Sequence, residues 1–169
     1  MRVGWLFALL VAVFVFRSTI LQALGLQGAY LNVDIALLTV AAVLRGPWEA
    51  AGLAALIGFL EDLTFGRWLG LHAMWLAMVI FATGWAVRPL FRKTLFIHVL
   101  AVVLATGVYE GGLYLFGRLI GDWPLEPVIV EKRLLLAMFW NGLIVFLGFP
   151  LWSRLLRPSR EDFLQSTPK

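Results

Sequence analysis

Long apolar stretches separated by short polar ones dominate the chain. Pro, Gly and charged residues divide it into apolar segments at 3–24, 33–44, 47–63, 69–87, 95–117 and 133–156. Within a segment, the apolar residues do not alternate in a way that would leave one face polar, which is typical of membrane-spanning helices. The pattern predicts an all-α fold: one integral membrane domain, a bundle of six transmembrane helices, with a basic cytoplasmic tail at 157–169.

The second segment is short for a membrane span. Its 12 residues reach only about 18 Å at about 1.5 Å per residue, against a hydrocarbon core of about 30 Å. We therefore expect this helix either to extend upstream into residues 27–32 or to cross incompletely. The turn Arg45-Gly46-Pro47 follows it, and Pro favours the first turn of a helix. The second and third segments are thus predicted to form a tight helical hairpin.

Composition supports the membrane interpretation. The chain is 62% hydrophobic and 14% charged, with a mean hydropathy of +0.90, whereas soluble domains are roughly 45–50% apolar and 25% charged. The N-terminal run resembles a signal peptide, but no small-residue cleavage site follows it, so we interpret it as an uncleaved first helix. The absence of Cys excludes disulfides and thiolate chemistry.

The distribution of basic residues predicts the direction of the helices. With six spans and a cytoplasmic N-terminus, nine Lys and Arg residues lie in the cytoplasm and four outside, with Arg17 buried. This is the positive-inside bias. It predicts that both termini are cytoplasmic, and it explains the net charge of +4 without nucleic-acid binding.

Polar residues recur at one depth in the predicted bundle. Arg17, Asp62 and Glu110 lie about 15 residues past the cytoplasmic ends of the outward-running helices, roughly 22 Å into the core. The inward-running helices carry polar residues near their outer ends: Asp34, His72 and Asn141. Such residues usually face the protein interior and pair with one another. We therefore expect a polar layer in the outer half of the membrane.

The third segment shows where its two acids point. Asp62 continues a row of small residues at a spacing of four, Ala50, Ala54 and Gly58, so we expect it on a closely packed face. Glu61 continues a row of bulky residues instead, and we expect it at the outer interface. Asp62 also lies at a helix C-terminus, where the macrodipole disfavours negative charge. His72, Arg67 and the amides that begin the next helix are the candidates to compensate it.

The polar layer allows three interpretations. In the first, its residues form internal contacts: an Arg17–Glu110 ion pair, and a bond from Asp62 to His72 or to the loop. In the second, they line a pocket open to the outside, and in the third, they catalyse a reaction. His72 beside carboxylates is compatible with acid–base chemistry or a metal site, but no nucleophile motif or second ligand set accompanies it. His98 is interpreted as a hydrogen-bonded helix residue. We therefore expect no enzyme activity, no metal and no cofactor.

Residues 32–81 resemble the rod shape-determining protein MreD family of bacteria. That family has an Asp-containing second helix, an Arg-Gly turn, a Gly-rich helix ending in Asp, a short loop, and then Leu-Gly-Leu-His-Ala. The matching positions here are Asp34, Arg45, Gly46, Gly52, Gly58, Asp62, Gly70, Leu71, His72 and Ala73. Val33 departs from the pattern, because the family usually has Pro there, and this leaves the start of the second helix less defined.

The resemblance implies a non-enzymatic component of the cell-elongation machinery in the bacterial inner membrane. The resemblance implies binding to the single-span protein MreC, beside RodA, a penicillin-binding transpeptidase and MreB, in support of peptidoglycan synthesis. Gly52, Gly58 and Ala77 are candidate contact positions, used either within the bundle or by a partner helix. The chain also resembles the substrate-binding membrane subunits of energy-coupling-factor transporters, which is the alternative. A transporter subunit needs a cavity around the polar layer, whereas a scaffold fills it with side chains.

Overall fold

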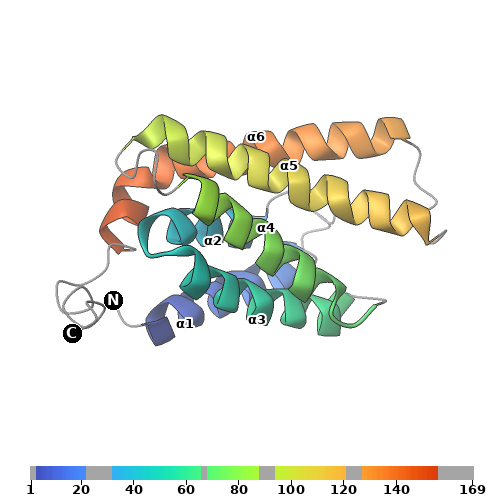
Figure 1. The fold of residues 1–169 in the computed structure, drawn as a ribbon, viewed down its shortest axis with the longest axis horizontal. Coiled ribbons are helices and arrows are strands. Elements are labelled where there is room, and N and C mark those ends of the chain that lie inside the picture. The colour runs from blue at the N-terminus through green and yellow to red at the C-terminus, as the bar shows by residue number, and fades with distance from the viewer. Residues whose placement is uncertain (1–2, 22–31, 66–67, 88–93, 121–126, 156–169) are drawn as a thin grey trace.

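The computed structural model describes residues 3–21, 32–65, 68–87, 94–120 and 127–155, and these are all-helical apart from short turns (Figure 1). Helix α1 spans Val3–Phe16 and continues as a π-helical turn, η1, over Arg17–Leu21. The other helices are α2 (Val33–Leu44), α3 (Pro47–Phe65), α4 (Leu71–Val87), α5 (Leu95–Leu119) and α6 (Pro127–Leu155). The predicted all-α class is confirmed for the described residues.

The predicted helix positions agree closely with the structure at the α2–α3 hairpin. Helix α2 covers the predicted residues 33–44, and α3 begins at Pro47. Gly46 between them has φ = 148°, a conformation that favours glycine, so the turn depends on this residue. Helix α6 begins at Pro127, six residues before its predicted start at 133. The end of the first predicted helix, residues 22–24, and the tail lie outside the described residues.

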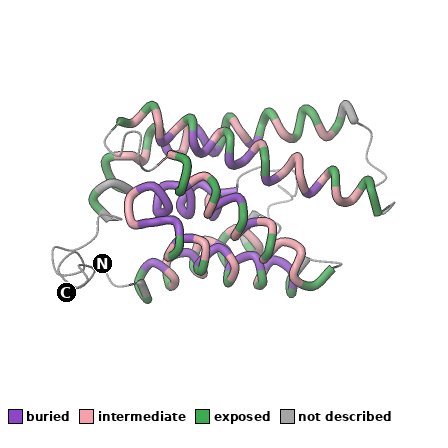
Figure 2. Tube along the Cα trace, in the orientation of Figure 1, coloured by how far each residue is buried: buried purple, intermediate pink, exposed green. Residues whose placement is uncertain are grey.

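Helix α2 is the centre of the bundle. It contacts every other α-helix, and its residues from Asp34 to Val43 are all buried (Figure 2). The helix does not extend upstream, because Asn32 has a non-helical backbone (φ −109°, ψ 72°). The predicted upstream extension of this helix therefore does not hold at Asn32.

The remaining helices are arranged around α2. Neighbouring pairs are α1 with α3, α3 with α4, α4 with α5, and α5 with α6. Successive helices alternate in direction, so the start of α1 and the end of α6 lie at the same end of the bundle (Figure 1). We call this end, where α1, α3 and α5 begin, the first end, and the other the second end.

Small residues allow the central helices to approach closely. A Cβ atom added at Gly58 would lie 2.6 Å from the Cα of Ala73, and one at Gly84 would lie 2.8 Å from the Cβ of Ala42. Gly58 therefore serves the α3–α4 contact within the bundle. Gly52 is different, because it is exposed and a Cβ there would have no neighbour within 4 Å.

The outside of the structure is strongly apolar. Large hydrophobic side chains are exposed along all helices except α2, while the buried set includes Asp34, Glu61, Asp62 and His98. Among the described residues, two stretches are long and apolar enough to cross a membrane, Leu95–Leu119 and Ile129–Leu151. The apolar parts of α1, α2 and α4 are shorter.

Candidate functional site: a buried polar layer

The carboxylate of Asp62 binds the start of the next helix. One of its oxygens accepts hydrogen bonds from the amide of Gly70 (2.9 Å) and the amide of Ala73 (3.1 Å). The other accepts from the amide of His72 (3.0 Å) and lies 2.8 Å from the imidazole Nδ1 of the same residue. Asp62 thus satisfies amides that begin α4 and lack helical partners, and their partial positive charge stabilises the carboxylate.

The positions of two glycines explain this contact. Gly58 lies one turn before Asp62 on α3, and its missing side chain lets the backbone of Ala73 approach. Gly70 has φ = 92°, which turns its amide toward the carboxylate and favours glycine. The predicted Asp62–His72 contact is confirmed, and the compensation that Asp62 requires at the α3 C-terminus comes from His72 and the α4 amides. Arg67 lies outside the described residues.

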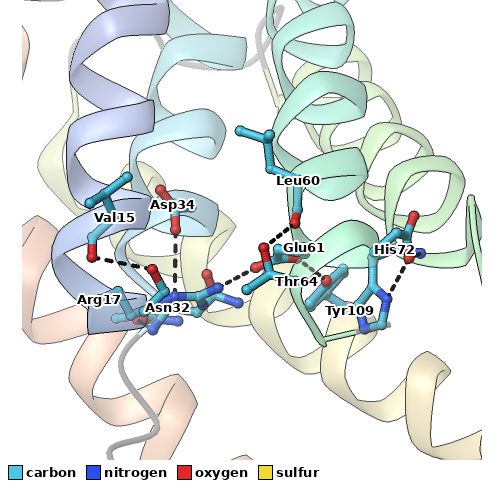
Figure 3. Close-up of polar contacts among 12 residues, drawn as sticks. Val15, Arg17, Asn32, Asp34, Leu60, Glu61, Thr64, His72 and Tyr109 are labelled. Carbon is cyan, nitrogen blue, oxygen red and sulfur yellow. Dashed lines mark hydrogen bonds and ion pairs between the residues drawn. The ribbon is translucent and has the colours of Figure 1, made fainter. Parts of the chain in front are cut away.

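A second group of polar residues surrounds Arg17. Its guanidinium donates to an oxygen of Glu61 on α3, and its Nε lies 3.7 Å from Asp34 at the start of α2 (Figure 3). The other oxygen of Glu61 accepts a hydrogen bond of 2.8 Å from the hydroxyl of Tyr109 on α5. Asp34 is fully buried, and Glu61 is 5% exposed. This group joins η1 to α2, α3 and α5.

Two predictions about these charges are wrong. Glu61 does not lie at the outer interface, because both the small-residue face and the bulky face of α3 are buried, as Ala54 and Ile57 show. Arg17 pairs with Glu61 and Asp34 and not with Glu110. Glu110 lies on α5 next to Tyr109, and within the described residues no ion pair joins it to Arg17.

A third group is centred on Asn141 of α6. Its side-chain oxygen accepts a hydrogen bond from the backbone amide of Asn32 (3.0 Å), and its side-chain nitrogen donates to the hydroxyl of Thr106 on α5 (3.1 Å). Asn141 and Thr106 are fully buried. The amide therefore fixes the chain entering α2 against the α5–α6 pair.

The three groups are linked through the chain. Glu61 of the Arg17 group and Asp62 of the His72 group are consecutive residues. Asn32 of the Asn141 group lies two residues before Asp34 of the Arg17 group. The sequence prediction of one polar layer is thus refined: Arg17 meets Asp34, Asp62 meets His72, and Asn141 meets neither set directly. Glu61, Tyr109, Thr106 and Asn32 were not among the predicted site residues, and Thr106 and Tyr109 carried no charge that would have marked them.

The candidate contact positions differ in their surroundings. Gly58 is buried against α4, Gly52 is exposed, and Ala77 on α4 is partly buried. His98 is a hydrogen-bonded helix residue as predicted, with Nδ1 3.0 Å from the carbonyl oxygen of Thr94. Its ring also lies edge-on to that of Phe149, with 4.9 Å between centroids.

Most polar groups of the layer are satisfied by one another, and the exceptions are the side-chain oxygens of Asn32 and Asp34. Asp62, Glu61 and Asn141 use both of their polar side-chain atoms on other helices or on the start of α4. Within the described residues, no group of three or more His, Cys, Asp or Glu side chains could hold a metal ion. The layer therefore joins helices to one another.

Comparisons of the chain with known protein families, with curated proteins and with solved structures give no match.

Proposed function

We propose that this protein is a six-helix integral membrane protein that binds a single-span partner as a scaffold, in the manner of the MreD family that it resembles. The observation that carries the proposal is that five of the ten matching positions belong to one structural unit. Gly58, Asp62, Gly70, His72 and Ala73 come from separate parts of the resemblance and form a single α3–α4 contact. A shared motif is more informative when its residues act together.

The distribution of side chains supports the membrane location. Soluble proteins bury apolar side chains and expose charged ones, whereas this structure buries charged residues under an apolar exterior.

The positions of exposed aromatic side chains also support a membrane location. Trp5, Trp48, Trp85 and Phe96 are 71–79% exposed. They lie near the starts of α1, α3 and α5 and near the end of α4, the helix ends that form the first end of the bundle (Figure 1). Aromatic residues collect at the membrane–water interface in this way.

The arrangement of the helices supports the proposed topology. The start of α1 and the end of α6 lie at the same end of the bundle, as an even number of crossings requires. We propose that this first end faces the cytoplasm of a bacterial inner membrane, because the basic residues of the chain are concentrated on that side under the six-span topology. Helices α5 and α6 have the length to cross the bilayer, and they would flank the shorter central helix.

The contacts of the polar layer favour a scaffold over a transporter subunit. A subunit that binds a solute needs polar groups that face an accessible space and exchange partners with the solute. Here Glu61 and Tyr109 bond to each other, and Asp62 accepts from donors of Gly70 and of the first turn of α4. Releasing these groups for a solute would separate the helices that they join. The alternative of a transporter subunit therefore has less support.

Capture of the protein from native membranes tests the proposal. The full-length tagged chain is purified in mild detergent after cross-linking, and the associated proteins and small molecules are identified by mass spectrometry. We expect a single-span MreC-like protein together with components of peptidoglycan synthesis. Recovery of a bound vitamin-like small molecule with an ATPase module would contradict the scaffold proposal and support the transporter subunit.

A pair of variants locates the contact with the partner. Gly52→Leu adds bulk to the exposed face of α3, where no atom lies within 4 Å of the added Cβ, so the bundle should stay folded. Gly111→Leu on α5 is the matched control, because a Cβ there also has no neighbour within 4 Å. Loss of partner capture with Gly52→Leu alone would place the partner on α3. Capture by both variants would exclude that face.

A further inference from the structure

The oxygen atoms at the start of α2 lack the hydrogen bonds that buried oxygens normally have. Among the described residues, no hydrogen-bond donor reaches the two carboxylate oxygens of Asp34 or the side-chain oxygen of Asn32, and all three atoms are buried. Asp34 is 0% exposed, and the Nε of Arg17, which forms its ion pair, is 3.7 Å away, beyond hydrogen-bond distance. Buried polar atoms are paired in most proteins. These three acceptors therefore call for a group that brings a donor or a positive charge.

The charges around Arg17 do not balance. Arg17 carries one positive charge, while Glu61 and Asp34 together carry two negative charges when both are ionised. Glu61 has charged and neutral donors on its two oxygens, from Arg17 and from Tyr109. Asp34 has none. The missing positive charge therefore belongs on Asp34 and not on Glu61.

The surroundings of Asp34 limit what this charge can be. A metal ion such as Ca²⁺ takes six or more oxygen ligands, and no group of acidic, His or Cys side chains in the described residues could hold a metal ion. A proton needs only one oxygen, and it turns the carboxylate into a donor. We propose that Asp34 binds a proton at neutral pH, so that the Arg17–Asp34–Glu61 cluster is neutral in the folded protein.

The groups that face this site come from several elements. Arg17 approaches from η1 and Glu61 from α3, with Tyr109 of α5 behind Glu61 (Figure 3). From α6, Asn141 binds the backbone of Asn32, next to the site. The side chain of Arg17 is 19% exposed, so the cluster is not completely enclosed by the described residues. Loss of the proton would leave a net negative charge where η1, α2 and α3 meet, and would weaken this junction.

Infrared spectroscopy of the full-length protein in lipid nanodiscs tests the proposal directly. A protonated carboxyl group has a C=O stretching band that an ionised carboxylate lacks. We expect such a band at neutral pH, and we expect it to shift when the aspartates of the wild-type protein carry ¹³C at the side-chain carbonyl. Asp34→Asn, which has the shape of the protonated acid, should abolish that band. Asp62→Asn is the matched control and should leave it, because Asp62 accepts from four donors.

Stability provides a second measurement that distinguishes a proton from another cation. If the folded state binds a proton that the unfolded state does not bind, the free energy of unfolding falls as the pH rises. The test compares stability between about pH 6 and about pH 9. The thermal midpoint of the wild type should fall over this range, and that of Asp34→Asn should change less. Absence of a label-shifted band in the wild type would overturn the proposal. So would stabilisation by NaCl over choline chloride that is lost in Asp34→Asn, which would assign the site to sodium.

Discussion

Replacing Gly58 by Ala should separate α3 from α4 and break the Asp62 contact. The added Cβ would lie 2.6 Å from the Cα of Ala73 and 2.7 Å from the carbonyl oxygen of His72. Both are backbone atoms of a helix and cannot rotate away. Ordinary carbon contacts are about 3.5–4.0 Å, so the helices must move apart by roughly 1 Å.

The size of the effect follows from the hydrogen bonds one turn away. The Asp62 oxygens accept from amides of α4 at 2.9–3.1 Å, and a displacement of about 1 Å takes these distances beyond the hydrogen-bond range. Overpacking costs about 1–3 kcal/mol, and a hydrogen bond to a charged group contributes about 1.5–3 kcal/mol. Because both losses have one cause, we expect the free energy of unfolding to fall by about 3–5 kcal/mol in total.

Reversible unfolding in mixed micelles of dodecyl maltoside and SDS measures this change. Gly52→Ala is the matched control, since it lies on the same helix and its Cβ would have no neighbour within 4 Å. This variant should unfold as the wild type does. Equal stability of Gly58→Ala and Gly52→Ala would refute the inference that the α3–α4 approach requires glycine at residue 58.

Three further predictions concern the polar layer and the topology. Asp62→Ala should destabilise the protein by about 2–4 kcal/mol in the same unfolding assay, because the amides at the start of α4 lose a charged acceptor. A change below about 0.5 kcal/mol, which is typical of a surface substitution, would contradict the inference that Asp62 stabilises the start of α4. Arg17→Met and Glu61→Leu should each cost about 3–5 kcal/mol, whereas the double variant should recover much of the loss; additive losses would argue against their pairing. Fusions after Lys93 and Lys169 should fluoresce with green fluorescent protein and be inactive with alkaline phosphatase, and active phosphatase at Lys169 would refute the proposed topology.

The prediction that 157–169 forms a basic tail concerns residues outside those that the structure describes. Cys accessibility of Arg157 and Arg160 variants in anionic and neutral nanodiscs tests whether the tail lies on the membrane surface, since each basic residue near anionic lipid contributes about 1 kcal/mol. Protection in anionic nanodiscs alone would support surface binding. Equal accessibility would indicate a solvated tail.

The sequence alone determined the helices and much of the α3–α4 contact. Helices α2 and α3 lie where Pro, Gly and charged residues predicted them, because these residues act locally on the backbone. The contact between Asp62 and His72 was also predictable, since a short loop joins their helices and the C-terminal carboxylate needs a positive partner. The start of α6 was placed too late, because the charged residues Glu131 to Arg133 are compatible with either a loop or a helix end.

Only the tertiary structure decided which polar residues meet across the bundle. Helix periodicity predicts the angular separation of two side chains on one helix, but not how wide a sector the neighbouring helices cover. For this reason Glu61 was expected at the interface, whereas the bulky face of α3 is buried and Glu61 bonds to Arg17 and Tyr109. Equal depth likewise predicted a pair between Arg17 and Glu110, but the order of helices around α2 places Glu61 and Asp34 beside Arg17. Depth comes from distance along the chain, whereas pairing requires the lateral arrangement that packing alone establishes.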